Sequence, residues 1–249
     1  MTLSLQLRSV SHSFQGIPVL DNVSLSVTPG EIVAIVGPSG CGKSTLLRIA
    51  AGLLDPTAGS VSSDNQTIGF VFQDPALLPW RRVQDNARLL AAQDDYDFVD
   101  ALLHTAGLAS HRNKWPHQLS GGMKMRLSLV RTLAMRPTVI LADEPFGALD
   151  QLTRQHLHDE LLSLHAAASF SLVMVTHAID EAVYLADRII TMSGASQGFV
   201  AETRSTLPRP RTAMLRYEPV FGEICGRVAT TLQADTTSLR DTAWTRDER

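Results

Sequence analysis

Two segments near the start of the chain alternate strictly between apolar and polar residues. Every second residue of segments 3–7 and 23–27 is Leu or Val, and the residues between them are Ser or Gln. A Pro-Gly pair at 29–30 follows the second segment. Alternation with a period of two is typical of strands that bury only one face. The pattern therefore predicts half-buried antiparallel strands.

A continuous apolar run at 32–36 predicts a further strand, and a glycine-rich loop and a helical pattern at 43–51 follow it. The alternation of helix and apolar strand returns after residue 120. The predicted elements there are a helix at 121–135, a strand at 138–142, a helix at 151–167, a strand at 172–176, a helix, and a strand at 188–192. Such alternation is typical of a mainly parallel sheet, so we expect an α/β fold.

The middle and the end of the chain have different patterns. A strand predicted at 68–72 leads into a stretch broken by prolines, and helical patterns follow at 83–92 and 96–106. We interpret residues from about 80 to 136 as a helical subdomain inserted into a domain that spans 1–197. Residues 198–249 are polar and contain one weak helical pattern (221–232), so we expect a C-terminal tail.

The composition is that of an ordinary globular protein of 249 residues, 44% hydrophobic and 19% charged. A net charge of −3 gives no reason to expect a nucleic-acid partner. No apolar run approaches the roughly 18 residues that cross a bilayer, and the first residues lack the basic start of a secretory signal. We therefore expect a cytoplasmic protein. Cys41 and Cys225 fit neither a metal site nor a disulfide framework and are expected to be packing residues.

The segment 37–44 reads G-P-S-G-C-G-K-S, which fits the phosphate-binding pattern G-x-x-x-x-G-K-[ST] between a predicted strand and a predicted helix. Backbone N–H groups at a helix N-terminus can hold phosphates, while Lys43 reaches the β- and γ-phosphates and the Ser44 hydroxyl ligates Mg²⁺. The alternative is an ordinary glycine turn. The expected ATP-contacting residues of this loop are Gly37, Pro38, Ser39, Gly40, Cys41, Gly42, Lys43, Ser44 and Thr45.

Two carboxylates, Asp143 and Glu144, end the apolar strand predicted at 138–142. The carboxyl ends of parallel strands converge on the ligand crevice, so both acids can face the same nucleotide. We expect Asp143 to hold Mg²⁺ and Glu144 to polarise the water that attacks the γ-phosphate. The alternative is a pair of solvated carboxylates.

Ser120, Gly121 and Gly122 come directly before a predicted helix, where Ser120 is a good N-cap and the glycines let a phosphate approach. Together with the loop at 37–44 and the acids, this motif makes residues 3–193 resemble the ATP-binding cassette (ABC) ATPases. The resemblance implies a P-loop NTPase (RecA-like) core with a small antiparallel β subdomain and the helical insertion. It also implies dimerisation, because in that family this signature motif completes the ATP site of the opposite subunit.

Four further positions follow from the resemblance. Phe14 lies where the family stacks an aromatic ring on adenine, with a core aromatic as the alternative. Gln73 resembles the glutamine that contacts Mg²⁺ and senses the membrane subunit, and Asp150 ends the 147–150 loop that crosses the dimer interface. His177 resembles the switch histidine that contacts the γ-phosphate. The alternatives are a loop hydrogen-bonding role for Gln73 and a packed strand end for His177.

Two features depart from the family pattern: Met123 replaces the usual glutamine, and segment 53–73 is short, which puts a hairpin of the antiparallel sheet in doubt. Three histidines (156, 158 and 165) share the helix predicted at 151–167. Since residues i and i+2 do not share a helix face, we expect solvated positions there rather than a metal site.

The runs at 72–81, 120–126 and 146–151 resemble importers of nitrate, sulfonate, taurine and related anions. The resemblance implies a homodimer that uses ATP and Mg²⁺, integral membrane permease subunits, a periplasmic solute-binding protein, and a peripheral location at the cytoplasmic face of the inner membrane. Leu77, Leu78 and Trp80 lie in a proline-broken loop and are expected to dock the membrane subunit. A core-packed Trp80 is the alternative there.

Other functions stay open. A lipid or drug exporter cassette is the strongest of them. A soluble cassette of DNA repair or translation would need a coiled-coil insertion, a second cassette or a basic surface, and a P-loop kinase would not need segment 119–123 or His177.

Overall fold

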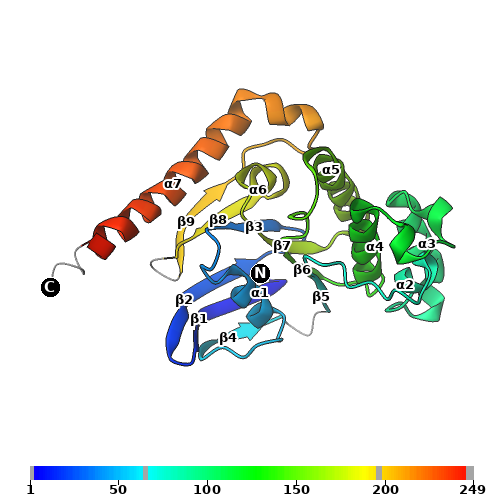
Figure 1. The fold of residues 1–249 in the computed structure, drawn as a ribbon, viewed down its shortest axis with the longest axis horizontal. Coiled ribbons are helices and arrows are strands. Elements are labelled where there is room, and N and C mark those ends of the chain that lie inside the picture. The colour runs from blue at the N-terminus through cyan, green and yellow to red at the C-terminus, as the bar shows by residue number, and fades with distance from the viewer. Residues whose placement is uncertain (1–2, 64–66, 195–197, 245–249) are drawn as a thin grey trace.

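The computed structural model describes residues 3–63, 67–194 and 198–244, and the chain forms two sheets with helices around them (Figure 1). None of the helices in these ranges is both long and apolar enough to cross a membrane.

The larger sheet has six strands in the order β5-β6-β7-β3-β8-β9. Its strands are β3 (Ile32–Val36), β5 (Ile68–Val71), β6 (Val139–Asp143), β7 (Ser171–Thr176), β8 (Arg188–Met192) and β9 (Phe199–Arg204). The first five in the order are parallel, and only β9 is antiparallel to its neighbour. Every residue of β3 and β7 is buried, which explains why these strands appear in the sequence as continuous apolar runs. The mainly parallel sheet is confirmed.

The smaller sheet is antiparallel, in the order β2-β1-β4. It contains β1 (Leu5–Phe14), β2 (Ile17–Val27) and β4 (Ala58–Ser62). The alternating Leu and Val side chains of β1 and β2 point into a core shared with one face of the larger sheet and with α1 (Lys43–Ala50). Segment 53–73 thus supplies β4 to this sheet, although residues 64–66 of it lie outside the described ranges.

Helices cover the other face of the larger sheet. They are α2 (Val83–Ala87), α3 (Tyr96–Thr105), α4 (Gly121–Leu133), α5 (Gln151–Ala168), α6 (Ile179–Leu185) and α7 (Pro219–Trp244). Short 3₁₀ helices occur at Gln93–Asp95, Ala109–His111, Pro116–Gln118 and Ala213–Tyr217. In Figure 1, α2, α3 and α4 lie together at one side of the molecule, yet their buried residues belong to the same core as the larger sheet. The helix predicted at 83–92 ends at Ala87, because the chain continues in turns with i to i−3 hydrogen bonds.

The helical pattern at 221–232 lies within α7, but the segment after residue 197 is not a polar tail, since it also contains β9 and α7 extends beyond the pattern at both ends. β9 extends the larger sheet and α7 packs along α6, β8 and β9 (Figure 1). Phe221, Ile224 and Val228 are buried, one turn apart on one face of α7. β9 was not predicted and α7 was predicted too short because an edge strand and a surface helix each bury only one side.

Candidate functional site

The loop between β3 and α1 has a shape that only glycine permits at two positions. Gly42 is the N-cap of α1 with φ of 100°, and a Cβ there would lie 2.9 Å from both the Val19 carbonyl oxygen and Leu20 Cδ2. A Cβ on Gly37 would lie 2.5 Å from the Met192 carbonyl oxygen. Both glycines therefore fit tightly against neighbouring strands. The first N–H groups of α1, which have no partner inside the helix, face this loop.

Lys43 is buried at the start of α1, and its Nζ donates hydrogen bonds to the carbonyl oxygens of Gly37 (2.8 Å) and Pro38 (2.9 Å). Burial raises the pKa of the Cys41 thiol in the same loop, so Cys41 stays protonated as a packing residue. A cavity of about 220 Å³ opens at the loop. Its lining residues are Val19, Ser39, Gly40, Gly42, Lys43, Ser44, Thr45 and Glu144.

The Ser44 hydroxyl donates a hydrogen bond of 2.8 Å to Oδ1 of Asp143, which ends β6. Hydroxyl and carboxylate oxygens are the ligands that Mg²⁺ prefers, and Mg²⁺ usually completes its shell with water and substrate phosphates. Two such oxygens beside a phosphate-binding loop therefore fit an Mg²⁺ site that depends on the nucleotide. The described residues contain no cluster of three His, Cys, Asp or Glu side chains that could hold a metal without it.

Glu144 stands at the centre of the site in a left-handed backbone conformation, with φ of 44°. Such a conformation at a non-glycine residue costs about 1–3 kcal/mol and marks a position that the surroundings fix. Its N–H donates to the Val175 carbonyl oxygen (3.1 Å), and its Oε2 lies 3.1 Å from His177 Nδ1. A Cβ on Gly147 would lie 3.5 Å from Gln73 Nε2 and 3.6 Å from Glu144 Oε2. The structure thus brings His177 and Gln73 close to Glu144, which itself lines the loop cavity.

The signature motif lies elsewhere. Ser120 caps α4 by accepting the N–H of Met123 (3.3 Å), but it is not among the described residues that line the loop cavity. A Cβ on Gly122 would lie 2.7 Å from Thr153 Cγ2, so this glycine also makes room for α5. Sequence reasoning missed this packing role, and it gave Asp150 only an interface role. Asp150 caps α5, and the hydrogen bond from Thr153 lowers the pKa of its carboxyl.

The exposure of three side chains decides between interpretations that the sequence left open or contradicts what it predicted. Phe14 is 47% exposed on β1 and packs edge-on against His12, which argues against a core aromatic. Trp80 is 70% exposed, so the core reading of Trp80 is wrong. His158 is buried, so the expectation that it is solvated is also wrong, since the side of α5 that carries it packs on α6. Met123 packs against the core.

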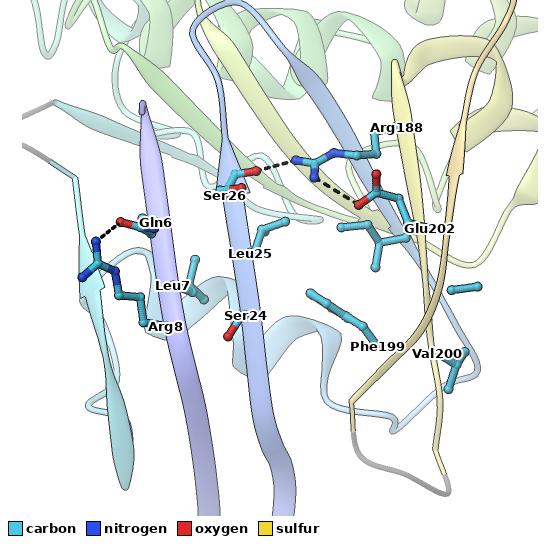
Figure 2. A pocket seen from close by; sticks show the side chains of 12 residues that line it. Gln6, Leu7, Arg8, Ser24, Leu25, Ser26, Arg188, Phe199, Val200 and Glu202 are labelled. Carbon is cyan, nitrogen blue, oxygen red and sulfur yellow. Dashed lines mark hydrogen bonds and ion pairs between the residues drawn. The ribbon is translucent and has the colours of Figure 1, made fainter. Parts of the chain in front are cut away.

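A second hollow of about 500 Å³ lies between the two sheets, away from the phosphate loop (Figure 2). Arg188 bridges it by donating to the Ser26 carbonyl oxygen and to Glu202 Oε2 (3.2 Å). Phe199 and Val200 of β9 line the hollow on the same side as Glu202, opposite residues of β1 and β2 (Figure 2). None of the residues that line this hollow belongs to the predicted ATP site, so we interpret the hollow as part of the packing interface between the two sheets.

Comparison with known proteins gives a consistent result. Residues 20–147 match the ABC transporter family. The chain is 42% identical to the aliphatic sulfonates import ATP-binding protein SsuB of Zymomonas mobilis, over 84% of this chain and 89% of that protein. It is 40% identical to the nitrate import ATP-binding protein NrtD of Synechococcus elongatus, over 82% of this chain and 81% of that protein. A solved dimeric ATP-binding cassette bound to ADP and Pi superposes with a TM-score of 0.69 at 32% identity, over 80% of this chain and 98% of that one.

The chain belongs to the ABC transporter family. It is an ATP-binding subunit of that family and hydrolyses ATP. The α/β fold, the mainly parallel sheet and the small antiparallel sheet that the sequence predicts are those of ABC ATPase domains.

Proposed function

We propose that two copies of this chain bind and hydrolyse ATP between them to drive bacterial uptake of a small anion of the sulfonate or nitrate type. One observation carries the proposal: Ser44 and Glu144 line one cavity with the phosphate loop, and they hydrogen bond to Asp143 and His177 respectively. The names of the relatives supply the kind of process and solute.

The chemistry follows from the atoms around that cavity. Lys43 and the N–H groups of residues 40–45 hold the phosphates, and Phe14 stacks on the adenine. Ser44, Asp143 and Gln73 hold Mg²⁺, which supplies charge neutralisation at the phosphate oxygens when bound. Positioning and electrostatics account for most of the catalysis in this class of reaction.

Glu144 acts as the general base. A carboxylate only accepts hydrogen bonds, so His177 Nδ1 carries the proton in the 3.1 Å contact with Glu144 Oε2. This contact occupies one carboxylate oxygen and leaves the other for the attacking water. It also leaves His177 Nε2 facing away from Glu144, and Nε2 can donate to the γ-phosphate only when both ring nitrogens carry a proton.

The ATP site is shared between two chains. Ser120, Gly121 and Gly122 lie apart from the phosphate loop of their own chain, and they serve the ATP held by the partner. Asp150 lies in the 147–150 loop that crosses the interface. The dimeric solved relative bound to ADP and Pi supports this arrangement.

The loop after β5 transmits the conformational change that accompanies ATP hydrolysis to integral membrane permease subunits. The chain binds these subunits at the cytoplasmic face of the inner membrane, and the permease receives solute from a periplasmic binding protein. This loop is held in shape from inside. The buried Asn86 side chain hydrogen bonds to the Leu78 backbone (2.9 and 3.0 Å) and to the Arg81 carbonyl oxygen (2.8 Å). Arg131 donates to the Ala76 carbonyl oxygen (2.9 Å). A loop anchored in this way presents the exposed Trp80 to a partner at low entropic cost.

The test has a biochemical and a cellular arm. Purified protein should hydrolyse MgATP, and Glu144→Gln should abolish most of that activity. A deletion strain should lose growth on an aliphatic sulfonate as sole sulfur source, or on nitrate as sole nitrogen source, and the wild-type gene alone should restore it. Hydrolysis with unaffected growth on both would retain the ATPase and reject these solutes.

A further inference from the structure

A buried polar cluster lies directly behind His177. Its members are Thr176 at the end of β7, Glu181 in α6 and His158 on α5, which are 2%, 3% and 2% exposed. The nucleotide chemistry proposed above uses none of the three. Because burying a polar side chain is costly unless it is hydrogen bonded, the contacts of this cluster indicate what it does.

Thr176 makes two hydrogen bonds through a single hydroxyl. The hydroxyl donates to Glu181 Oε2 (2.9 Å) and accepts the backbone N–H of Ala178 (3.0 Å). Thr176 and Ala178 are the two chain neighbours of His177. The bend that carries His177 is therefore tied on both sides to one carboxylate in α6. His177 itself is exposed, so the backbone at this bend sets where its ring reaches Glu144.

The far side of Glu181 faces His158. Glu181 Oε1 lies 3.8 Å from His158 Nε2, and within the described part of the chain neither atom has a hydrogen-bond partner. Arg216 Nη2 lies 3.3 Å from His158 Nδ1. A guanidinium group only donates, so Nδ1 accepts and the proton of the neutral ring lies on Nε2, next to Glu181. The carboxylate of Glu181 thus accepts a hydrogen bond from Thr176 on β7 and faces the N–H of His158 on α5 without a hydrogen bond to it.

We propose that Glu181 is a positioning residue for His177: its carboxylate orients the Thr176 hydroxyl, the hydroxyl holds the Ala178 N–H, and the bend between them sets the contact of His177 with Glu144. This inference rests on the proposed ATPase mechanism, and it adds residues that do not touch the nucleotide. A misplacement of 1 Å can cost a reaction about 100-fold. Since the loss of these bonds loosens the bend without removing His177, we expect a loss of roughly tenfold.

The experiment compares disruptive and conservative variants of the whole chain at the same two positions. Thr176→Val and Glu181→Leu keep the approximate volume but remove the hydroxyl or its acceptor. Thr176→Ser and Glu181→Gln keep a hydroxyl and an acceptor oxygen. The measurements are kcat for MgATP hydrolysis, the Kd of ATP by calorimetry, and thermal melting. Wild type and Glu144→Gln are run beside them.

The disruptive variants should lower kcat roughly tenfold with the ATP Kd within about twofold of wild type, and the conservative variants should keep at least about half of kcat. The double variant should be no slower than either disruptive single variant, because both changes break one chain of contacts. Three results would overturn the inference. The disruptive variants could keep the wild-type kcat, the conservative variants could lose as much kcat as the disruptive ones, or the affinity for ATP could fall in step with kcat.

Two further outcomes are distinct. A wild-type chain without Glu144-dependent hydrolysis would overturn the ATPase mechanism and this inference together, whereas normal wild-type hydrolysis matched by the disruptive variants overturns only the positioning role. If both disruptive variants fail to fold, amide hydrogen exchange in the wild-type chain decides. Ala178 should then be protected as a donor to Thr176, and exchange at the rate of an open loop would reject the proposal.

Discussion

Replacing Glu181 by Gln should raise the free energy of unfolding at pH 8 and change it far less at pH 5. Burial, opposed by the Thr176 hydrogen bond and the Arg154 charge and reinforced by Asp180 and Glu144, raises the pKa of Glu181 from 4.5 to about 7. A pKa that is raised in the folded state gives a stability contribution that is complete below pH 4.5 and is lost as the pH rises through about 7. At pH 8 the native fold therefore contains a buried ionised carboxylate, and Gln removes that charge.

The size of the effect can be worked out from the same contacts. A change from 4.5 to about 7 corresponds to about 3 kcal/mol at 1.36 kcal/mol for each pH unit. The amide hydrogens of Gln would face the proton on His158 Nε2, which costs about 1 kcal/mol. We expect a net gain of about 2 kcal/mol at pH 8, or about 4–8 °C in Tm for a chain of this size. At pH 5 most of the gain disappears, because Glu181 is then already neutral in the native state.

Urea unfolding of both chains at several values between pH 5 and pH 8 measures this difference. Glu218→Gln, which changes an exposed glutamate, is the matched control and should shift stability by less than about 0.5 kcal/mol at every pH. A stability difference for Glu181→Gln that does not vary with pH would refute the reasoning about the buried charge. The same result would leave the hydrogen-bond argument for Thr176 untouched, since Gln keeps the acceptor.

Other predictions concern the ATP site and its partners. Glu144→Gln should keep ATP binding and lower kcat roughly 10²- to 10⁴-fold, the range for a lost general base, whereas Lys43→Ala should weaken binding itself; stopped-flow binding and steady-state hydrolysis separate the two. Mixing Ser120→Arg chains with Lys43→Ala chains should restore part of the activity, because one of the two shared sites is then intact; no recovery, with heterodimers shown by mass spectrometry, would count against sharing. Trp80→Ala should leave Tm and basal hydrolysis unchanged while reducing co-purification with the membrane subunit, and a fall in Tm of several degrees would instead indicate that Trp80 supports the fold.

The parts of the fold that the sequence predicted well are those with strong local signals. The strands that are buried on both faces, such as β3 and β7, have unbroken apolar sequences, and their predicted bounds differ from the observed ones by at most one residue. The phosphate loop was predictable because its glycines satisfy a backbone geometry that other residues cannot adopt. β9 was missed, and α7 was predicted only over 221–232, because each buries only one side and its burial depends on strands and helices distant in sequence.

The candidate site divides in the same way. Recognisable motifs contain Lys43, Asp143 and Glu144, so the sequence alone predicts roles for these residues at the nucleotide. The pairing of Glu144 with His177 needs two strands to end side by side, which only the sheet order provides. The burial of His158 could not be read from its own helix, because neighbours on α6 and at Arg216 cover it. A polar residue covered by distant segments looks solvated in sequence.

Two arginines in the segment after β9 contact α6, the helix that follows His177. Arg211 donates to carbonyl oxygens at the end of α6, those of Tyr184 and Ala186 (2.6 Å), where a helix leaves its last carbonyls unsatisfied. Arg216 lies over the Tyr184 ring at 3.3 Å from its centre and also contacts His158. Since α6 begins two residues after His177, these contacts hold the helix whose first turn contains Glu181. The phosphate loop, Asp143 and Glu144 lie within the matched range 20–147, whereas His177 and the residues that we propose to orient it lie outside that range. The motifs within the matched range therefore indicate the chemistry, and our proposal adds that the C-terminal segment helps to position His177 for it.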